Sequence, residues 1–513
     1  SPPVPPAIAE AESPSEEPAE IVESPEVPML SADEALEIEP LDLESEFPET
    51  DVELEDSEPE APANVTGELP TVGPAEVAPE LLPEDTDEAE PAGEEEDTLL
   101  VASNEGDPLA EPMAEEEASA EVAGPAQLGS YLGNDDVLLQ YNQASGKWVR
   151  MPPRSEVWSG STLLTLPKFR VHVVLPDVNA YLSGGTRIEI PVVEPAIEGV
   201  DAAGFELAVN YGRVLLNADL NGSDIALRLG EEVRRIRLAG SASLAVEVEH
   251  KFVPGSNNEQ VRAPVEVNWY LTSGSVEMLS DGQDPQTIES PARWVTLGGV
   301  DGSPQPFEEL PEWIDREPMT DLQRRACDAL VEELVPGEPV DIRLLELNDP
   351  RNKGRRSEVR ALAAESSVHV GEFEPFVKSL SDKDQRRVWE THIKTLRQAL
   401  ALSPDIAVKV REAFVNLRGE EAAAELIEMV SGYDQSAIGK TPEEVKEGAV
   451  AALVRRLEND SLDYRVLAIH NLNEILGTIS LKGYQPDDSS QRRRVAVAKI
   501  QASFQAGELF PKP

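Results

Sequence analysis

The sequence predicts a multidomain protein: a disordered acidic linker at residues 1–128, an all-β sandwich or roll at residues 129–310 and an all-α helical array at residues 311–513. Three observations predict this order. Prolines and acidic clusters dominate the first part, alternating polar and apolar side chains the second, and apolar residues at helical spacing the third. A length of 513 residues accommodates two or three domains of ordinary size.

The linker is predicted from its charge and its proline content. Residues 1–130 carry 40 of the 99 acidic residues and none of the 43 basic ones, and residues 1–128 hold 20 of the 43 prolines. A segment this charged and this poor in large apolar side chains cannot bury enough surface to offset its ordering entropy. We therefore expect an extended spacer. Acidic clusters such as residues 94–97 lack the ligand spacing and the glycine turn of a calcium loop.

The net charge of -56 excludes two classes of partner. A field this negative repels phosphate, so neither nucleic acid nor an anionic membrane surface is expected as a ligand. No run of about 18 apolar residues occurs in the sequence, so we expect any membrane anchor or signal segment upstream of Ser1. Lys147 is the first basic residue, which agrees with export of this part of the chain.

The β-domain is predicted from runs in which apolar and polar side chains alternate. These runs are residues 171–175, 187–190, 205–209, 234–238, 244–249 and 265–269. Turn formers such as Gly184-Gly185 and Asn221-Gly222 separate the runs, and no full amphipathic helix lies between them. The pattern predicts half-buried strands in an antiparallel sandwich or roll.

The order of these runs and their glycines resembles the FecR-like domain, whose members show strands followed by Gly-x-Val turns and Gly-Ser or Gly-Thr steps. The matching segments are residues 158–161, 164–167, 207–214, 236–241 and 274–278. The resemblance implies a non-catalytic domain on the outer side of a bacterial cytoplasmic membrane that relays a signal to a sigma factor. We therefore expect an extracytoplasmic location in the cell envelope, with the cytoplasm as the alternative.

Two departures from the FecR-like pattern stand in this chain. It has no sigma-binding helical segment at its start, and helices replace the small C-terminal βαβ module of the family.

The helical domain is predicted from capping signals and apolar stripes. Thr441, Pro442 and Glu444 form a capping-box start, and one helix is expected to continue to Leu457. After a polar turn, residues 462–476 carry a second apolar stripe at the same spacing. The two helices predict an αα-hairpin, which needs neighbours because it cannot cover its own stripe.

Three turns of the helical domain share a signature, in which an Asp in the turn precedes an Arg on the next helix. The pairs are Asp349 with Arg360, Asp382 with Arg387, and Asp460 with Arg465. This resembles the HEAT-like repeat, whose Asp caps the second helix and whose Arg ties one repeat to the next. The irregular spacing of the three aspartates predicts a degenerate array of about four helix pairs, and the resemblance implies that this array binds other proteins.

Basic residues gather at two places in the helical domain, residues 351–356 and 492–494. The candidate partner-binding residues are Arg355, Arg356, Arg492, Arg493 and Arg494. We expect an acidic protein partner there, and we expect the acidic linker to screen the same surface weakly. Arginines at a helix start are also common on solvated faces, which is the alternative interpretation. The predicted function is a non-catalytic envelope protein with a helical interaction scaffold and a signalling or regulatory role.

Two other functions remain open. In a carbohydrate-binding envelope protein, tryptophans of the β-domain stack on a glycan, although packing in the core is the usual fate of Trp. The candidates are Trp148, Trp158, Trp269 and Trp294. An enzyme with its site at the junction of the β- and α-domains, around residues 313–327, has less support because no His lies near Cys327 in the sequence.

No catalytic, metal-binding or cofactor-binding residue is predicted. The single Cys327 excludes an internal disulfide. His392 and His470 lie on amphipathic helices and are expected to be partly exposed residues rather than ligands. The sequence contains no nucleophile elbow, phosphate-binding glycine loop or Cys-x-x-Cys pair.

Overall fold

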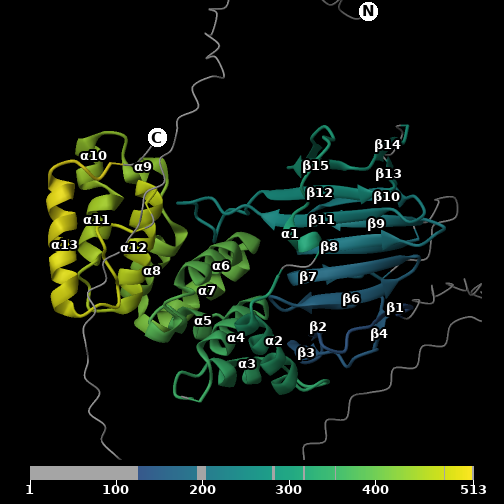
Figure 1. Cartoon of the computed structure of the whole chain (residues 1–513), viewed down its shortest axis with the longest axis horizontal. Coiled ribbons are helices and arrows are strands. Elements are labelled where there is room, and N and C mark those ends of the chain that lie inside the picture. The colour runs from purple at the N-terminus through teal and green to yellow at the C-terminus, as the bar shows by residue number, and fades with distance from the viewer. Residues whose placement is uncertain are drawn as a thin grey trace, which may run out of the picture. The chain divides into compact units, whose positions relative to one another are not determined.

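The computed structural model describes residues 125–192, 204–279, 284–315, 318–352, 354–478 and 480–510. These residues belong to one compact unit, Met113–Pro513, in which strands come first and helices follow (Figure 1). The β-domain and the all-helical domain are therefore confirmed. Residues 1–124 of the predicted linker lie outside the described residues.

Sixteen strands lie in the described part of the β-domain. They are β1 (Gln127–Tyr131), β2 (Leu138–Asn142), β3 (Lys147–Arg150), β4 (Glu156–Trp158), β5 (Thr162–Thr165), β6 (Arg170–Leu175), β7 (Val178–Glu189), β8 (Phe205–Ala218), β9 (Ser223–Leu229), β10 (Glu232–Leu238), β11 (Ser243–His250), β12 (Val265–Ser273), β13 (Ser275–Leu279), β14 (Gln286–Glu289), β15 (Ala292–Leu297) and β16 (Val300–Asp301).

The long strands β7 and β8 each belong to two groups of strands. Residues 178–183 of β7 pair with β6, whereas residues 187–189 pair with β5. Residues 205–209 of β8 pair with β9, and residues 212–217 pair with β11. One group continues through β11 to β12 and β15, and the other through β9 to β10 and β13. Among the described strands, β8 and β9 form the single parallel pair, and all other pairs are antiparallel as expected.

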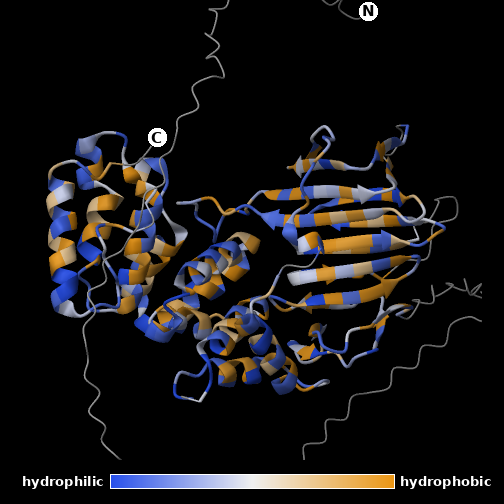
Figure 2. Ribbon diagram, viewed as in Figure 1, coloured by the Kyte–Doolittle hydropathy of each residue, from blue (hydrophilic) through white to orange (hydrophobic). Residues whose placement is uncertain are grey.

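The two groups bury their apolar faces in one core, which makes the domain a sandwich. Along β6, Val171, Val173 and Leu175 are buried and the residues between them are half-buried. Trp269 of β12 is 0% exposed in the same core. Figure 2 shows the resulting alternation of apolar and polar residues along the strands. Burial of each large apolar side chain contributes about 1.5–3 kcal/mol, so the predicted period-two pattern is what holds the sheets together.

The helices follow the last strand. They are α1 (Glu312–Asp315), α2 (Asp321–Glu333), α3 (Asp341–Asn348), α4 (Ser357–His369), α5 (Glu374–Ser379), the 3-10 helix η1 (Lys383–Gln385), α6 (Trp389–Leu402), α7 (Pro404–Arg418), α8 (Glu420–Ser431), α9 (Gln435–Ile438), α10 (Pro442–Glu447), α11 (Ala449–Arg456), α12 (Leu462–Leu476) and α13 (Ser490–Gln505). Among the described helices, none has both the length and the apolar character needed to cross a bilayer.

The single helix predicted from Thr441 to Leu457 is wrong, because two helices, α10 and α11, occupy this range. The capping box is confirmed: the Thr441 hydroxyl accepts from Glu444 N, and the Glu444 carboxylate accepts from Thr441 N. At Gly448 the backbone leaves the helical region, with φ -83° and ψ -159°. A Cβ at this position would lie 2.6 Å from the carbonyl oxygen of Ala437. The break therefore accompanies a close approach of the α9 turn, which an apolar stripe does not encode.

The Asp and Arg residues of the turn signature contact other side chains or main-chain atoms rather than each other's charged groups. Arg360 of α4 makes an ion pair with Asp382, in the turn after α5, and not with Asp349. Asp349 pairs with Arg351 at 2.7 Å. Asp382 also caps η1, where its carboxylate accepts a hydrogen bond from the main-chain N–H of Asp384. Arg387 is exposed. Arg360 therefore connects α4 to the turn before η1, and its partner is Asp382.

Arg465 and Arg397 bind main-chain carbonyls inside the helical core. Arg465 of α12 donates to the carbonyl oxygen of Asp460 at 2.7 Å, so these two residues of the signature meet through the backbone. Arg397 of α6 donates to Asn471 at 3.0 Å and to Glu474 at 2.8 Å, both on α12. These bonds connect helices that share one large core, which extends from α4 to α13.

The first helices pack on the outer faces of the sandwich. Apolar residues of α2, α3 and α4 form a second core with β2, β3 and β5, and it contains Trp148 and Leu330. Trp313 and Ile314 of α1 pack on Leu215 of β8 and on β11. The β-domain and the first helices are therefore joined by continuous apolar packing.

Candidate functional site

The predicted partner-binding arginines occupy two places on the helical domain. Arg355 and Arg356 directly precede α4, and Arg492, Arg493 and Arg494 lie in the first turns of α13. Of these five side chains, Arg356, Arg492 and Arg494 are exposed, and the other two are half-buried.

The first cluster offers less free charge than its sequence suggests. Arg355 Nη1 lies 3.0 Å from Glu333 Oε1, so this guanidinium is paired with α2. Arg351 is paired with Asp349. Lys353 of the same cluster lies outside the described residues. Arg356, which makes no ion pair with the described residues, is the accessible member of this cluster.

The turn around η1 lies between the two clusters and contacts the segment next to each of them. Gln385 Nε2 donates to the carbonyl oxygen of Ser357 at 3.2 Å, which places η1 beside the start of α4. On its other side, Arg386 Nη1 lies 3.3 Å from Asp487 Oδ2, directly before α13. We call this the basic surface. Its residues are Arg356, Arg386, Arg387, Arg492, Arg493 and Arg494.

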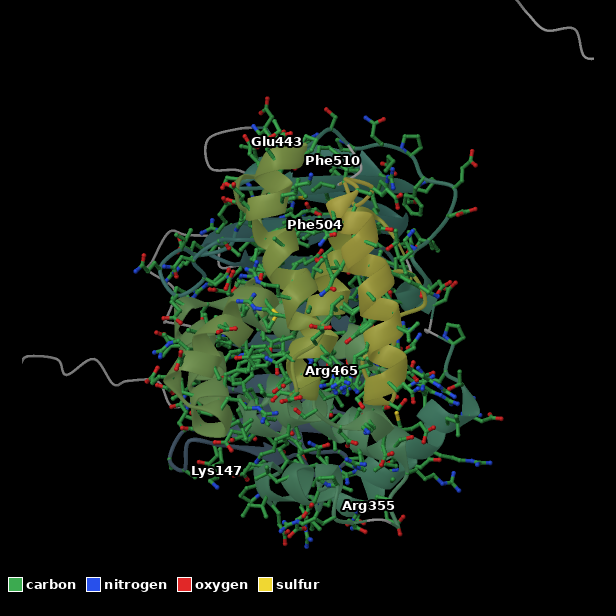
Figure 3. All side chains as sticks on the ribbon, turned by 90° about the vertical axis from the view of Figure 1, so that its left-hand side faces the viewer. Lys147, Arg355, Glu443, Arg465, Phe504 and Phe510 are labelled. Atoms are coloured by element: carbon green, nitrogen blue, oxygen red, sulfur yellow. The ribbon has the colours of Figure 1, made fainter. Side chains whose placement is uncertain are left out.

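A cation of the basic surface influences a buried arginine beneath it. Burial and, after it, the charge of Arg493 lower the pKa of Arg465, which lies under this surface. Asp487 and Asp488 lie between the arginines, but the Arg492–Asp488 ion pair is long, at 3.8 Å. Figure 3 shows Arg355 and Arg465 on the lower half of one face, where many nitrogen-bearing side chains gather.

The histidines of the helical core do not form a ligand set. The expectation that His392 is partly exposed is wrong: it is 1% exposed, and burial lowers its pKa to about 4. His470 is half-buried as expected, and burial together with Arg397 lowers its pKa to about 4. Within the described ranges, no group of three or more His, Cys, Asp or Glu side chains is placed to hold a metal ion.

Cys327 is a packed residue of α2. It is 6% exposed, and its Sγ lies 4.0 Å from the Sδ of Met319. Burial raises the pKa of the thiol to about 11, so the reactive thiolate is scarce at neutral pH. This environment is that of a structural cysteine.

Three of the four candidate tryptophans cannot act as exposed sugar platforms. Trp148, Trp269 and Trp294 are buried, and the last two stack on each other with ring centroids 5.4 Å apart. Trp158, with 38% exposure, is the exception. Packing in the core, the alternative interpretation, is therefore correct for three of them.

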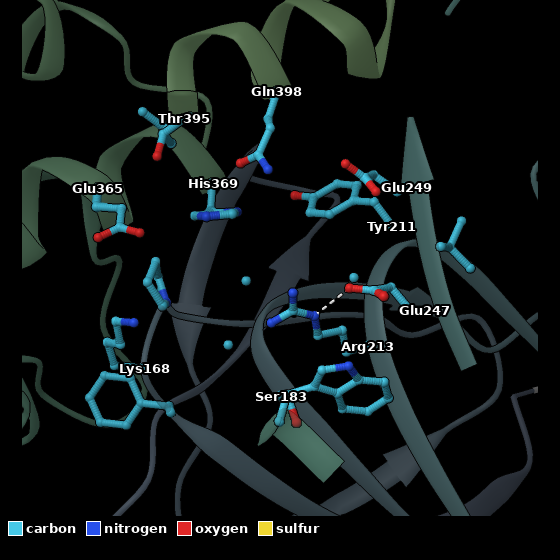
Figure 4. A pocket seen from close by; sticks show the side chains of 18 of the residues that line it. Lys168, Ser183, Tyr211, Arg213, Glu247, Glu249, Glu365, His369, Thr395 and Gln398 are labelled. Atoms are coloured by element: carbon cyan, nitrogen blue, oxygen red, sulfur yellow. Dashed lines mark hydrogen bonds and ion pairs between the residues drawn. The ribbon is translucent and has the colours of Figure 1, made fainter. Parts of the chain in front are cut away.

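A pocket of about 340 Å³ lies where α4 and α6 meet the bend of β7 and β8 (Figure 4). The turn before β6, the bend itself and β11 form its β-domain side. His369 of α4 and Gln398 of α6 cover it, and Trp313 of α1 forms another wall. The volume lies within the range of small-molecule sites.

A bulge in β7 shapes the wall of this pocket. The register between β7 and β8 slips at residues 183–187. Gly185 has φ +72° and Gly212, on β8, has φ +101°, values that favour glycine. A Cβ on Gly185 would lie 2.7 Å from Cε1 of His369, so the imidazole ring packs directly on the strand. The buried Thr186 hydroxyl accepts from a main-chain N–H of β8 at 2.8 Å and holds the bulge.

The side chains of the pocket suit hydrogen bonding better than acid–base chemistry. Arg213 Nε lies 2.7 Å from Glu247 Oε1, and the guanidinium lies 5.7 Å from the ring centroid of Trp313. Burial lowers the pKa of His369 to about 4, so its ring is neutral at pH 7. Burial also raises the pKa of Tyr211 to about 12, so its hydroxyl stays protonated. Neither group titrates near neutral pH, where a general acid or base is most effective.

Sequence reasoning does not predict this pocket. Gly184-Gly185 was expected to separate two strands, but the pair lies inside β7, where it forms the bulge. A glycine pair within a strand-like run is also the signal of a bulge, and this is the one local sign of the site. The remaining lining residues come from positions between 167 and 402 and share no motif.

No family model, curated protein or solved structure matches this chain. The FecR-like and HEAT-like resemblances therefore stay predictions, and the function is argued from the geometry of the basic surface and the pocket.

Proposed function

We propose that this chain is a non-catalytic protein of the bacterial cell envelope, and that its helical domain is a scaffold for an acidic segment of a partner protein. The basic surface carries this proposal. Three segments that are distant in the sequence contribute arginines to it, in a chain whose net charge is -56. A local excess of cations on an otherwise acidic protein attracts and orients an acidic ligand.

The guanidinium groups of the basic surface are available to a partner. The Arg386–Asp487 pair is 3.3 Å long and the Arg492–Asp488 pair 3.8 Å long, and the Arg492 side chain is 79% exposed. An exposed pair such as Arg492–Asp488 contributes little to stability, about 0–1 kcal/mol. A partner carboxylate can therefore replace Asp488 at small cost and gain a bidentate contact with the guanidinium.

The envelope location and the signalling or regulatory role come from the FecR-like resemblance. A β-sandwich followed by packed helices agrees with a FecR-like domain joined to HEAT-like repeats. Protease accessibility in intact cells of the native host tests the location. Digestion from outside supports it, and a protein protected in the cytoplasm contradicts it.

Binding of an acidic peptide tests the scaffold. The probe is a fluorescent peptide with the sequence of residues 84–97, and the protein is the chain from Gln127 onward. We expect saturable anisotropy changes at 0.1 M salt that are lost at 1 M, because the Debye length falls from about 10 Å to about 3 Å. The triple variant Arg492→Glu, Arg493→Glu, Arg494→Glu should weaken binding at least tenfold.

A matched control separates the surface from the net charge. The variant Lys440→Glu, Lys446→Glu, Arg455→Glu reverses three exposed charges around α10 and α11, outside the basic surface. It should bind the peptide within about threefold of the unchanged protein. If the two triple variants weaken binding equally, the attraction comes from overall charge and the basic surface is not the site.

A further inference from the structure

The pocket between the bulge of β7 and helices α4 and α6 presents hydroxyl groups that the protein does not use. Tyr211 of β8, Ser183 of β7 and Thr395 of α6 line it (Figure 4). Their side-chain oxygens make no hydrogen bond to the described residues. Ser183 and Thr395 are each 8% exposed. None of the three oxygens is among the described side-chain atoms that are both buried and without a partner, so they are open to the pocket and can bond to a ligand or to water.

The charged groups of the pocket balance one another. Arg213 is paired with Glu247 at 2.7 Å, and Glu249 is paired with Lys251 at 2.8 Å. Arg170 donates to the carbonyl oxygen of Asp315 at 2.7 Å. The lining holds three cationic and three anionic side chains, the other two being Lys168 and Glu365. A ligand with a net charge would meet no compensating excess, so an uncharged ligand fits best.

Flat apolar surfaces lie beside these polar groups. Trp313, Phe169 and Leu402 line the pocket together with the neutral ring of His369. Sites of this type fix a ligand by a few polar contacts and obtain affinity from the apolar walls. Gln398, which is exposed, adds an amide donor and acceptor at the rim.

We propose that this pocket binds a small neutral saccharide of one or two rings. Sugar hydroxyls both donate and accept, as do the hydroxyls of Tyr211, Ser183 and Thr395. This activity is separate from the docking of an acidic protein segment, and its site differs from the tryptophan platforms that the sequence suggested.

Calorimetric titration of the full chain tests the proposal. The ligands are glucose, galactose, N-acetylglucosamine, maltose and trehalose, with glucuronate and glycine as charged and zwitterionic comparators. We expect saturable binding of at least one neutral sugar. Tyr211→Phe and Thr395→Val each remove one hydrogen-bonding group with little change of shape, and each should weaken that binding three- to tenfold.

The matched control is Tyr141→Phe, which removes a hydroxyl from β2 outside the pocket lining and should leave affinity unchanged. Thermal unfolding of each variant shows that the fold is kept. The proposal is overturned if no neutral sugar binds at 20 mM, which leaves the hydroxyls to water. Binding of glucuronate or glycine alone, or equal weakening by Tyr141→Phe, also overturns it.

Discussion

At the scale of single residues, the helical core buries polar side chains in two different ways. Arg397 distributes its guanidinium among three acceptors: the carbonyl oxygen of Val430 at 2.9 Å, Asn471 at 3.0 Å and Glu474 at 2.8 Å. His392 has no hydrogen-bond partner for either ring nitrogen among the described residues and packs on Phe376, with centroids 4.6 Å apart. The first arrangement stabilises a charge, whereas the second is compatible only with a neutral ring.

The buried His392 makes stability fall in acid. Its pKa is lowered from 6.5 to about 4, so the unfolded chain takes up a proton as pH falls below 6.5 while the folded chain does not. Stability present above pH 6.5 is therefore lost between pH 6.5 and 4, by about 3 kcal/mol for this residue. His392→Leu should flatten this loss in urea unfolding measured from pH 7.5 to 4.5.

The control for this experiment is Ile393→Leu, a change at a buried neighbour that does not titrate. It should shift stability equally at every pH. If the free energy of unfolding of His392→Leu falls below pH 6.5 as steeply as that of the unchanged protein, the buried ring of His392 is not the cause. His369 and His470 also have pKa values lowered to about 4, so part of the limb persists in every variant.

At the scale of elements, the contact between β7 and α4 holds the pocket together. The bulge turns the backbone of Gly185 toward the imidazole ring of His369, which lies at the end of α4. The same helix packs on β5 and β2 through the second core. A bulge and a helix end thus define the geometry of the pocket. This explains why the sequence pattern of a single strand or helix does not predict the pocket.

Substitution of Gly185 measures this contact. Gly185→Ala meets two costs, a positive φ of +72° and a Cβ at 2.7 Å from the His369 ring. Gly371→Ala meets the first cost alone, because φ is +87° and nothing lies within 4 Å of its Cβ. The φ cost is about 1–2 kcal/mol in either variant. Gly185→Ala should therefore be less stable than Gly371→Ala in urea unfolding by a further 1–3 kcal/mol or so. Equal stabilities of the two variants would show that the C-terminal end of α4 can move away from Gly185 at no measurable cost.

At the scale of the whole molecule, charge is distributed unevenly along the chain. Residues 1–130 carry 40 acidic residues and no basic one, whereas residues 311–513 carry 35 acidic and 29 basic residues. The basic surface lies in this most balanced part. If the proposed docking is correct, an acidic segment of the chain itself should compete with an acidic partner for the same arginines.

Small-angle scattering of the full chain at 0.1 M and 1 M salt tests this competition. A tail that screens the basic surface is released when salt weakens the attraction, so the radius of gyration should rise. A free coil that repels itself contracts under the same change. The variant Arg492→Glu, Arg493→Glu, Arg494→Glu should not show the rise. Contraction of the unchanged protein would mean that the segment is only a spacer.

The sequence by itself determined that a β-domain is followed by a helical domain, because periods of 2 and 3.6 residues and the capping box at Thr441 are local properties. Only the tertiary structure decided where Gly448 breaks a helix and where Gly185 makes a bulge, since both depend on contacts with distant elements. It also decided that the start of α4 and the segment before α13 both meet η1, and that β- and α-elements enclose a pocket. Spacing along the chain carries no information about such meetings, which arise when apolar faces of separate elements pack together.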